Sequence, residues 1–61
     1  MKISKKAEFL VRNIVMGKVT YLDVMECKAV KDSEANGENP TLAAQIDAYL
    51  EQEHLEIDKT K

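Results

Sequence analysis

The sequence contains one pair of residues at the spacing of a metal or acid–base site. Glu51 and His54 are three positions apart, which is the Glu-x-x-His spacing found in the di-iron sites of ferritin-like bundles. On a helical wheel both fall outside the apolar stripe that begins at Leu42, so we expect both side chains to face solvent. The additional inward glutamates of a di-iron site are not evident. We therefore expect neither a metal nor another cofactor.

The remaining reactive side chains are too few for the common catalytic sets. Cys27 is the single cysteine, and it has no histidine at helical spacing. One histidine and two glycines supply neither a Ser/His/Asp triad nor a glycine-rich phosphate loop. We expect a protein that is not an enzyme. The lone thiol, together with the lack of a signal-peptide core or membrane-span pattern, predicts a cytoplasmic protein that does not contact membranes.

The stretch "MGKVTYLDVM" places Gly17 between two apolar patterns, as the turn of a DNA-reading helix-turn-helix does. Such a turn requires a small residue four positions before the glycine and apolar residues six and nine positions after it. Those positions hold Asn13, Asp23 and Glu26, all of them polar. Acidic side chains in the reading helix repel phosphates, so the stretch favours the corner of a helical bundle.

A nucleic-acid-binding transcriptional regulator is nevertheless the alternative function. Several cations cluster in and around the first helical pattern, and a dimer would double their number. These possible phosphate contacts are Lys2, Lys5, Lys6, Arg12 and Lys18.

The apolar periodicity predicts a compact, all-α, three-helix domain. The helices are expected at about residues 4–16, 20–35 and 40–56, within a single domain over residues 1–61 that ends in a short flexible C-terminal tail. Their core-facing positions are Ile3, Ala7, Leu10, Val11 and Ile14 in the first helix, Leu22, Met25 and Ala29 in the second, and Leu42, Ile46, Tyr49, Leu50 and Ile57 in the third.

The predicted helix starts carry recognisable caps. Ser4 is the expected N-cap of the first helix, and Thr20 caps the second, with Asp23 three residues later completing a capping box. Asn39 is expected to cap the third helix, with Pro40 in its first turn.

Two helices carry apolar residues on a second side, away from the predicted core. A chain of 61 residues has a small core, so leaving such residues in water costs stability that it can hardly spare. We expect this surplus surface to meet another helix, most simply in a homodimer. The predicted partner or dimer interface consists of Phe9, Arg12, Met16, Ala44, Ala48 and Leu55.

The charge is unevenly distributed along the chain. Residues 1–31 hold seven Lys or Arg against three Asp or Glu, whereas residues 32–61 hold two against eight. The predicted third helix could present an acidic face to a basic helix of a second copy or to a basic groove of another protein. Its members are Asp47, Glu51, Glu53, Glu56 and Asp58.

Taken together, these features predict a small binding protein. We expect it to regulate or inhibit an unidentified protein partner, and its size resembles that of accessory regulators carried by mobile elements.

Overall fold

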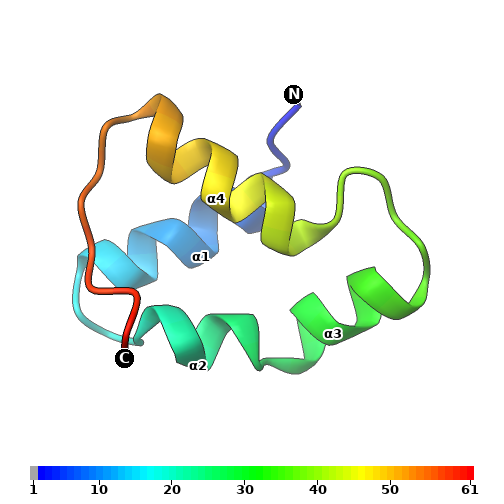
Figure 1. Ribbon diagram of the computed structural model, residues 1–61, viewed down its shortest axis with the longest axis horizontal. Coiled ribbons are helices and arrows are strands. Elements are labelled where there is room, and N and C mark those ends of the chain that lie inside the picture. The colour runs from blue at the N-terminus through cyan, green and yellow to red at the C-terminus, as the bar shows by residue number, and fades with distance from the viewer. Residues whose placement is uncertain (1) are drawn as a thin grey trace.

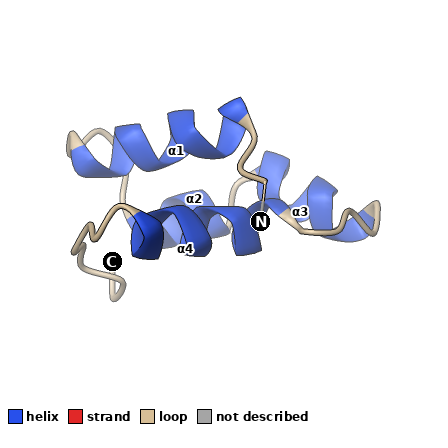
Figure 2. Cartoon of the chain, turned by 90° about the horizontal axis from the view of Figure 1, so that it is seen from above, coloured by secondary structure: helices blue, strands red, loops and turns tan. Residues whose placement is uncertain are grey.

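The computed structural model describes residues 2–61 and contains four helices. They are α1 (Lys5–Val15), α2 (Tyr21–Met25), α3 (Lys28–Ala35) and α4 (Leu42–Gln52). No strand occurs within the described residues, so the predicted all-α class is confirmed. The most extensive packing joins α1 to α4, and α2 and α3 follow one another along the opposite side of the molecule (Figure 1). Figure 2 shows α1 and α4 side by side.

The first two predicted helix starts are confirmed. The Ser4 hydroxyl accepts a hydrogen bond from the Ala7 N–H at 3.2 Å. Thr20 and Asp23 form the capping box, in which the Thr20 hydroxyl accepts from the Asp23 N–H at 3.1 Å. Gly17 follows α1 with a φ of +76°, a left-handed conformation that glycine adopts without a Cβ clash. Gly17 and the Thr20–Asp23 capping box set the corner between α1 and α2.

The prediction of one continuous helix over residues 20–35 is wrong. The helix breaks at Glu26 and Cys27, and Cys27 has an extended backbone with φ −71° and ψ 159°. In an unbroken helix Val24 and Val30 would lie about 120° apart around the axis. The break re-orients α3, so that Val24 and Val30 both reach the core and are only 3% and 2% exposed. Leu22, which we expected in the core, is 41% exposed.

The third predicted helix begins later than expected. Thr41, not Asn39, is the N-cap of α4, and its hydroxyl accepts from the Ala44 N–H at 3.2 Å. Pro40 precedes the helix, and its carbonyl oxygen accepts a hydrogen bond from the Gln45 side chain at 3.1 Å. The hydroxyl of Thr41 and this contact place the helix start two residues later than the Asn39-Pro40 pattern predicted.

The same helix also ends earlier, at Gln52 rather than Glu56. His54 takes a left-handed conformation with φ +54°, and the Leu55 N–H donates to the Leu50 carbonyl at 2.9 Å. This is the hydrogen-bond pattern of a Schellman ending, which characteristically brings the residue after the left-handed position against the last turn. Leu55 accordingly packs against the core.

Beyond this ending the chain turns back toward α2. Ile57, which the sequence placed on the third helix, packs against the core from this returning segment. The Lys61 carbonyl oxygen accepts a hydrogen bond from the Leu22 N–H at 2.6 Å. Residues 53–61, which the sequence divided between the end of the third helix and a short flexible tail, therefore run from the end of α4 past α1 to the start of α2 (Figure 1).

The core is small and apolar, with two polar side chains at its margin. The Ser33 hydroxyl accepts from the Leu42 N–H at 2.8 Å and donates to Glu38 at 2.9 Å. The Gln45 side-chain oxygen accepts from the Ser4 N–H at 2.8 Å. These bonds tie α3 and the N-terminal segment to α4. The buried apolar residues are Ala7, Val11, Ile14, Val24, Val30, Leu42, Ile46 and Leu50.

Substituting Ser33→Ala should destabilise the protein by about 1–3 kcal/mol, because it leaves the buried Leu42 N–H without an acceptor. The free energy of unfolding is measured by urea denaturation followed by circular dichroism. Glu34→Ala, at an exposed neighbouring position on α3, is the matched control and should change stability by no more than about 0.5 kcal/mol. Equal stability of the two variants would show that the Ser33 contact does not stabilise the start of α4.

Candidate functional site

The most prominent surface feature is an apolar stripe on the side of α1 that faces away from the core. Phe9 is 59% exposed and Met16, the C-cap of α1, is 56% exposed. Both lie about 140–180° around the helix axis from the buried residues of α1. Arg12 is exposed between them. We call Phe9, Arg12 and Met16 the outer face of α1.

The surroundings of this face are basic. Lys5, Glu8, Phe9 and Arg12 line a shallow hollow on α1, and Glu8 is the one acidic residue of this helix. The cations named in the sequence as possible phosphate contacts, Lys2, Lys5, Lys6, Arg12 and Lys18, are all exposed, and none of them takes part in an ion pair within residues 2–61. An apolar stripe flanked by unneutralised cations is suited to an acidic, partly apolar partner.

On α4 the side opposite the core has a different character. Ala44 and Ala48 are half-buried but do not belong to the core cluster, and Glu51 is exposed beside them. We call Ala44, Ala48 and Glu51 the outer face of α4, with Asp47 at its edge. The other predicted acidic residues, Glu53, Glu56 and Asp58, are exposed but lie beyond the end of the helix.

Leu55 does not extend the alanine stripe, although the sequence grouped it with Ala44 and Ala48. It follows the Schellman ending of α4 and packs toward the core, where it lines a hollow with Ile14 and Val15. The structure therefore groups Phe9, Arg12 and Met16 on one side of α1 and, separately, Ala44 and Ala48 on one side of α4. It places Leu55 with neither group.

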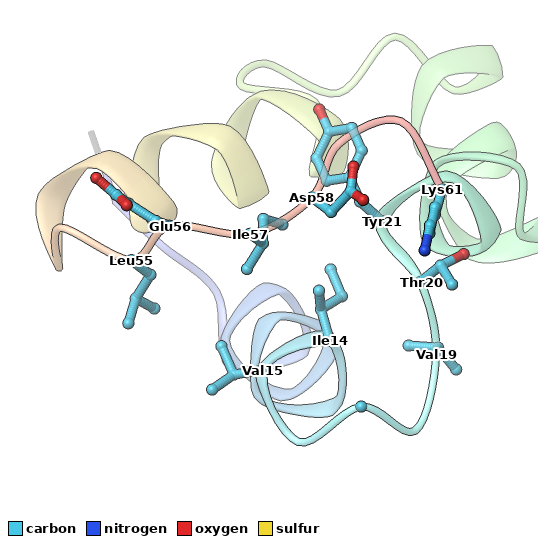
Figure 3. Close-up of a pocket in the computed structure, with 11 residues that line it drawn as sticks. Ile14, Val15, Val19, Thr20, Tyr21, Leu55, Glu56, Ile57, Asp58 and Lys61 are labelled. Carbon is cyan, nitrogen blue, oxygen red and sulfur yellow. The ribbon is translucent and has the colours of Figure 1, made fainter.

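That hollow lies between the end of α1, the start of α2 and the returning C-terminal segment (Figure 3). Its volume is about 330 Å³, and its walls are mainly apolar, including Ile14, Val15, Val19 and Ile57. The charged residues that line it, Glu56, Asp58 and Lys61, are exposed, whereas Tyr21 lines it half-buried. Such a hollow can accept an apolar side chain, and its described walls hold no buried acid–base pair.

A polar cluster holds the C-terminal segment against α2 and α4. The Tyr21 hydroxyl donates to the Asp47 carboxylate at 2.7 Å. Lys59 lies 3.8 Å from the same carboxylate, and its ammonium stands 5.3 Å from the centroid of the Tyr21 ring. Asp47 is thus engaged within the chain. Sequence reasoning did not identify this cluster, because its members are 12 to 38 positions apart and no local pattern links them.

Burial raises the pKa of Tyr21 to about 12, and the hydrogen bond to the Asp47 carboxylate and its negative charge act in the same direction. A phenol with a raised pKa in the folded state stabilises the fold below its unfolded pKa of about 10. This contribution is lost as the pH rises toward about 12.

The pair with metal-site spacing is not assembled into a site. Glu51 and His54 are both exposed, as the wheel predicted, and His54 lies past the end of α4. Within residues 2–61 no three His, Cys, Asp or Glu side chains stand close enough together to hold a metal ion. Cys27 is half-buried at the N-cap of α3.

The corner at Gly17 also differs from a DNA-reading turn. The helix that would enter the groove is interrupted, because α2 contains only five residues and α3 starts anew at Lys28. A reading helix normally presents several consecutive turns to the major groove. The geometry agrees with the bundle corner that the sequence favoured.

No protein-family model matches this chain, and no match is found among curated proteins or solved structures. In the described part of the chain no helix is long and apolar enough to cross a membrane.

The raised pKa of Tyr21 can be measured in a Tyr49→Phe variant, which leaves Tyr21 as the single tyrosine. The absorbance of its phenolate should develop with a midpoint near pH 12 in the folded protein. Adding Asp47→Asn should lower the midpoint, because the carboxylate charge that opposes phenolate formation is removed. A midpoint at the ordinary value of about 10 in both proteins would show that the cluster does not form.

Proposed function

We propose that this protein is a non-enzymatic interaction module that acts by binding a protein partner through the outer face of α1. The observation that carries the proposal is the exposure of Phe9 and Met16 together, at 59% and 56%, on the side of α1 opposite the core. Regulation or inhibition would follow from occupying a surface that the partner otherwise uses.

The small core leaves the burial of the Phe9 side chain unused. Burying a phenylalanine side chain is worth about 1.5–3 kcal/mol relative to leaving it in water. None of the buried core residues in the described part of the chain is aromatic; Tyr21 and Tyr49 pack against the core from its edge, and the single phenylalanine is outside it. A partner that covers Phe9 and Met16 gains free energy that the fold itself leaves unused.

The composition of the face supports binding to a protein. Isolated exposed apolar residues are ordinary and require no explanation. Here, however, an aromatic residue and a methionine share one stripe with an arginine between them. Aromatic, methionine and arginine side chains are the types enriched at the centres of protein interfaces.

A nucleic-acid-binding regulator is the second candidate, and the exposure of all five N-terminal cations without ion pairs supports it. It accounts less well for the apolar stripe, since phosphate binding depends on cations and has no use for exposed Phe9 and Met16. Nuclease treatment separates this candidate from the first in the experiment below.

Substituting Phe9→Ser should abolish partner binding while leaving the fold intact, because the side chain makes no contribution to the core. The purified, tagged chain is immobilised and exposed to extract of its native host, with and without nuclease treatment, and the retained proteins are compared with those held by the variant. Leu22→Ser is the matched control, as Leu22 is also exposed but lies on α2.

We expect the wild type and Leu22→Ser to retain the same proteins and Phe9→Ser to lose them, with equal helicity by circular dichroism. Retention of the same set by all three proteins would contradict binding through α1. Loss of all retained material on nuclease treatment would favour the nucleic-acid candidate instead.

A further inference from the structure

We propose that the outer face of α1 docks on the outer face of α4 of a second copy of this chain. This inference rests on the proposed function, since it uses the same face of α1. It identifies the protein that binds this face as a second copy of the chain. The two faces have complementary shape and opposite charge, and both belong to one molecule.

Charge disfavours the simplest symmetric arrangement, in which the α1 faces of two copies meet each other. Lys5, Lys6 and Arg12 are exposed on this helix, and Glu8 is its single acidic residue. Two such helices packed together would bring six cations to the contact against two carboxylates. Like charges that face one another at an interface weaken association, so an acidic counterpart suits the α1 face better than a second α1 face does.

The outer face of α4 supplies that counterpart. Glu51 is exposed, and its carboxylate takes part in none of the hydrogen bonds or ion pairs of residues 2–61. Asp47 at the edge of the face is already held by Tyr21 and Lys59. Glu51 is therefore the carboxylate available to meet Arg12 of another copy, through the charge-assisted hydrogen bonds that arginine forms with carboxylates.

The shapes of the two faces also match. Phe9 and Met16 project from α1, whereas Ala44 and Ala48 present short side chains on α4. Small residues allow a facing helix to approach closely, so large side chains can pack over them. Both helices contain 11 residues, which gives each a length of about 16 Å and allows them to pair along their whole extent.

A contact between two different faces has two possible outcomes. It closes into a dimer when a twofold axis makes the same contact twice, and it otherwise continues into longer assemblies. Both outcomes raise the sedimenting mass above that of a single chain, and both depend on Arg12 and Glu51.

Charge reversal tests the pairing directly. Arg12→Glu and Glu51→Lys are each prepared in the full chain and examined by sedimentation at concentrations where the wild type associates. Each reversal should weaken association by about tenfold or more, because it places like charges together at the contact. An equimolar mixture of the two variants should regain the wild-type mass, since each outer face of one variant then meets an oppositely charged face of the other.

Lys31→Glu and Glu34→Lys, both at exposed positions on α3, are the matched controls and should sediment as the wild type does. Circular dichroism confirms that every variant retains its helices. A wild type that sediments as a single chain at all concentrations overturns the proposal, as does a mixture that stays dissociated. Either result leaves the partner-capture experiment with Phe9→Ser unaffected, so the two proposals can fail separately.

Discussion

The packing of α4 against α1 holds this molecule together, and it can bury only one side of each helix. Val11 on α1 and Ile46 on α4 are almost completely enclosed, and the rest of the core is built around them. Within residues 2–61, α2, α3, the N-terminal segment and the returning C-terminal segment all pack residues against this core. The opposite side of α1 leaves Phe9 and Met16 more than half exposed, and the opposite side of α4 leaves Glu51 exposed beside the half-buried Ala44 and Ala48.

The outer sides of α1 and α4 differ in side-chain size and in charge. One is apolar and basic, with Phe9 and Met16 around Arg12, and the other is small and acidic, with Ala44 and Ala48 beside Glu51. A chain selected only for solubility would be expected to place charged residues on both. The basic N-terminal half of the sequence supplies the outer face of α1, and the acidic C-terminal half supplies the outer face of α4. The two neighbouring helices therefore differ in charge. That difference underlies both proposals.

The sequence predicted much of this fold because helix caps and apolar periodicity are local signals. Ser4, Gly17, and Thr20 with Asp23 set their helix ends as expected. The predictions were wrong where packing between distant parts of the chain, and not a local signal, determined where a helix breaks or ends. The break at Cys27 allows Val24 and Val30 to share one core, and no residue near it is a helix breaker. Leu55 left the predicted helix because His54 takes a left-handed conformation and α4 ends there; histidine adopts this conformation more often than most residues but far less often than glycine, so it is a weak stop signal in a sequence. The wheel separated the inner from the outer side of α1 correctly, since it needed only the helix itself.

The central claim is that a second copy of the chain covers the outer face of α1, and the ring of Phe9 reports on this most directly because it is the only phenylalanine. Nuclear magnetic resonance can measure how strongly a soluble paramagnetic agent broadens the Phe9 ring signals as the protein is concentrated. If a second copy covers the face, the signals of the Phe9 and Met16 side chains should be broadened less as the protein concentration rises, because the agent can no longer reach them. The signals of the exposed Leu22 side chain should be broadened equally at every protein concentration. Phe9 signals that remain equally broadened at every concentration would contradict it.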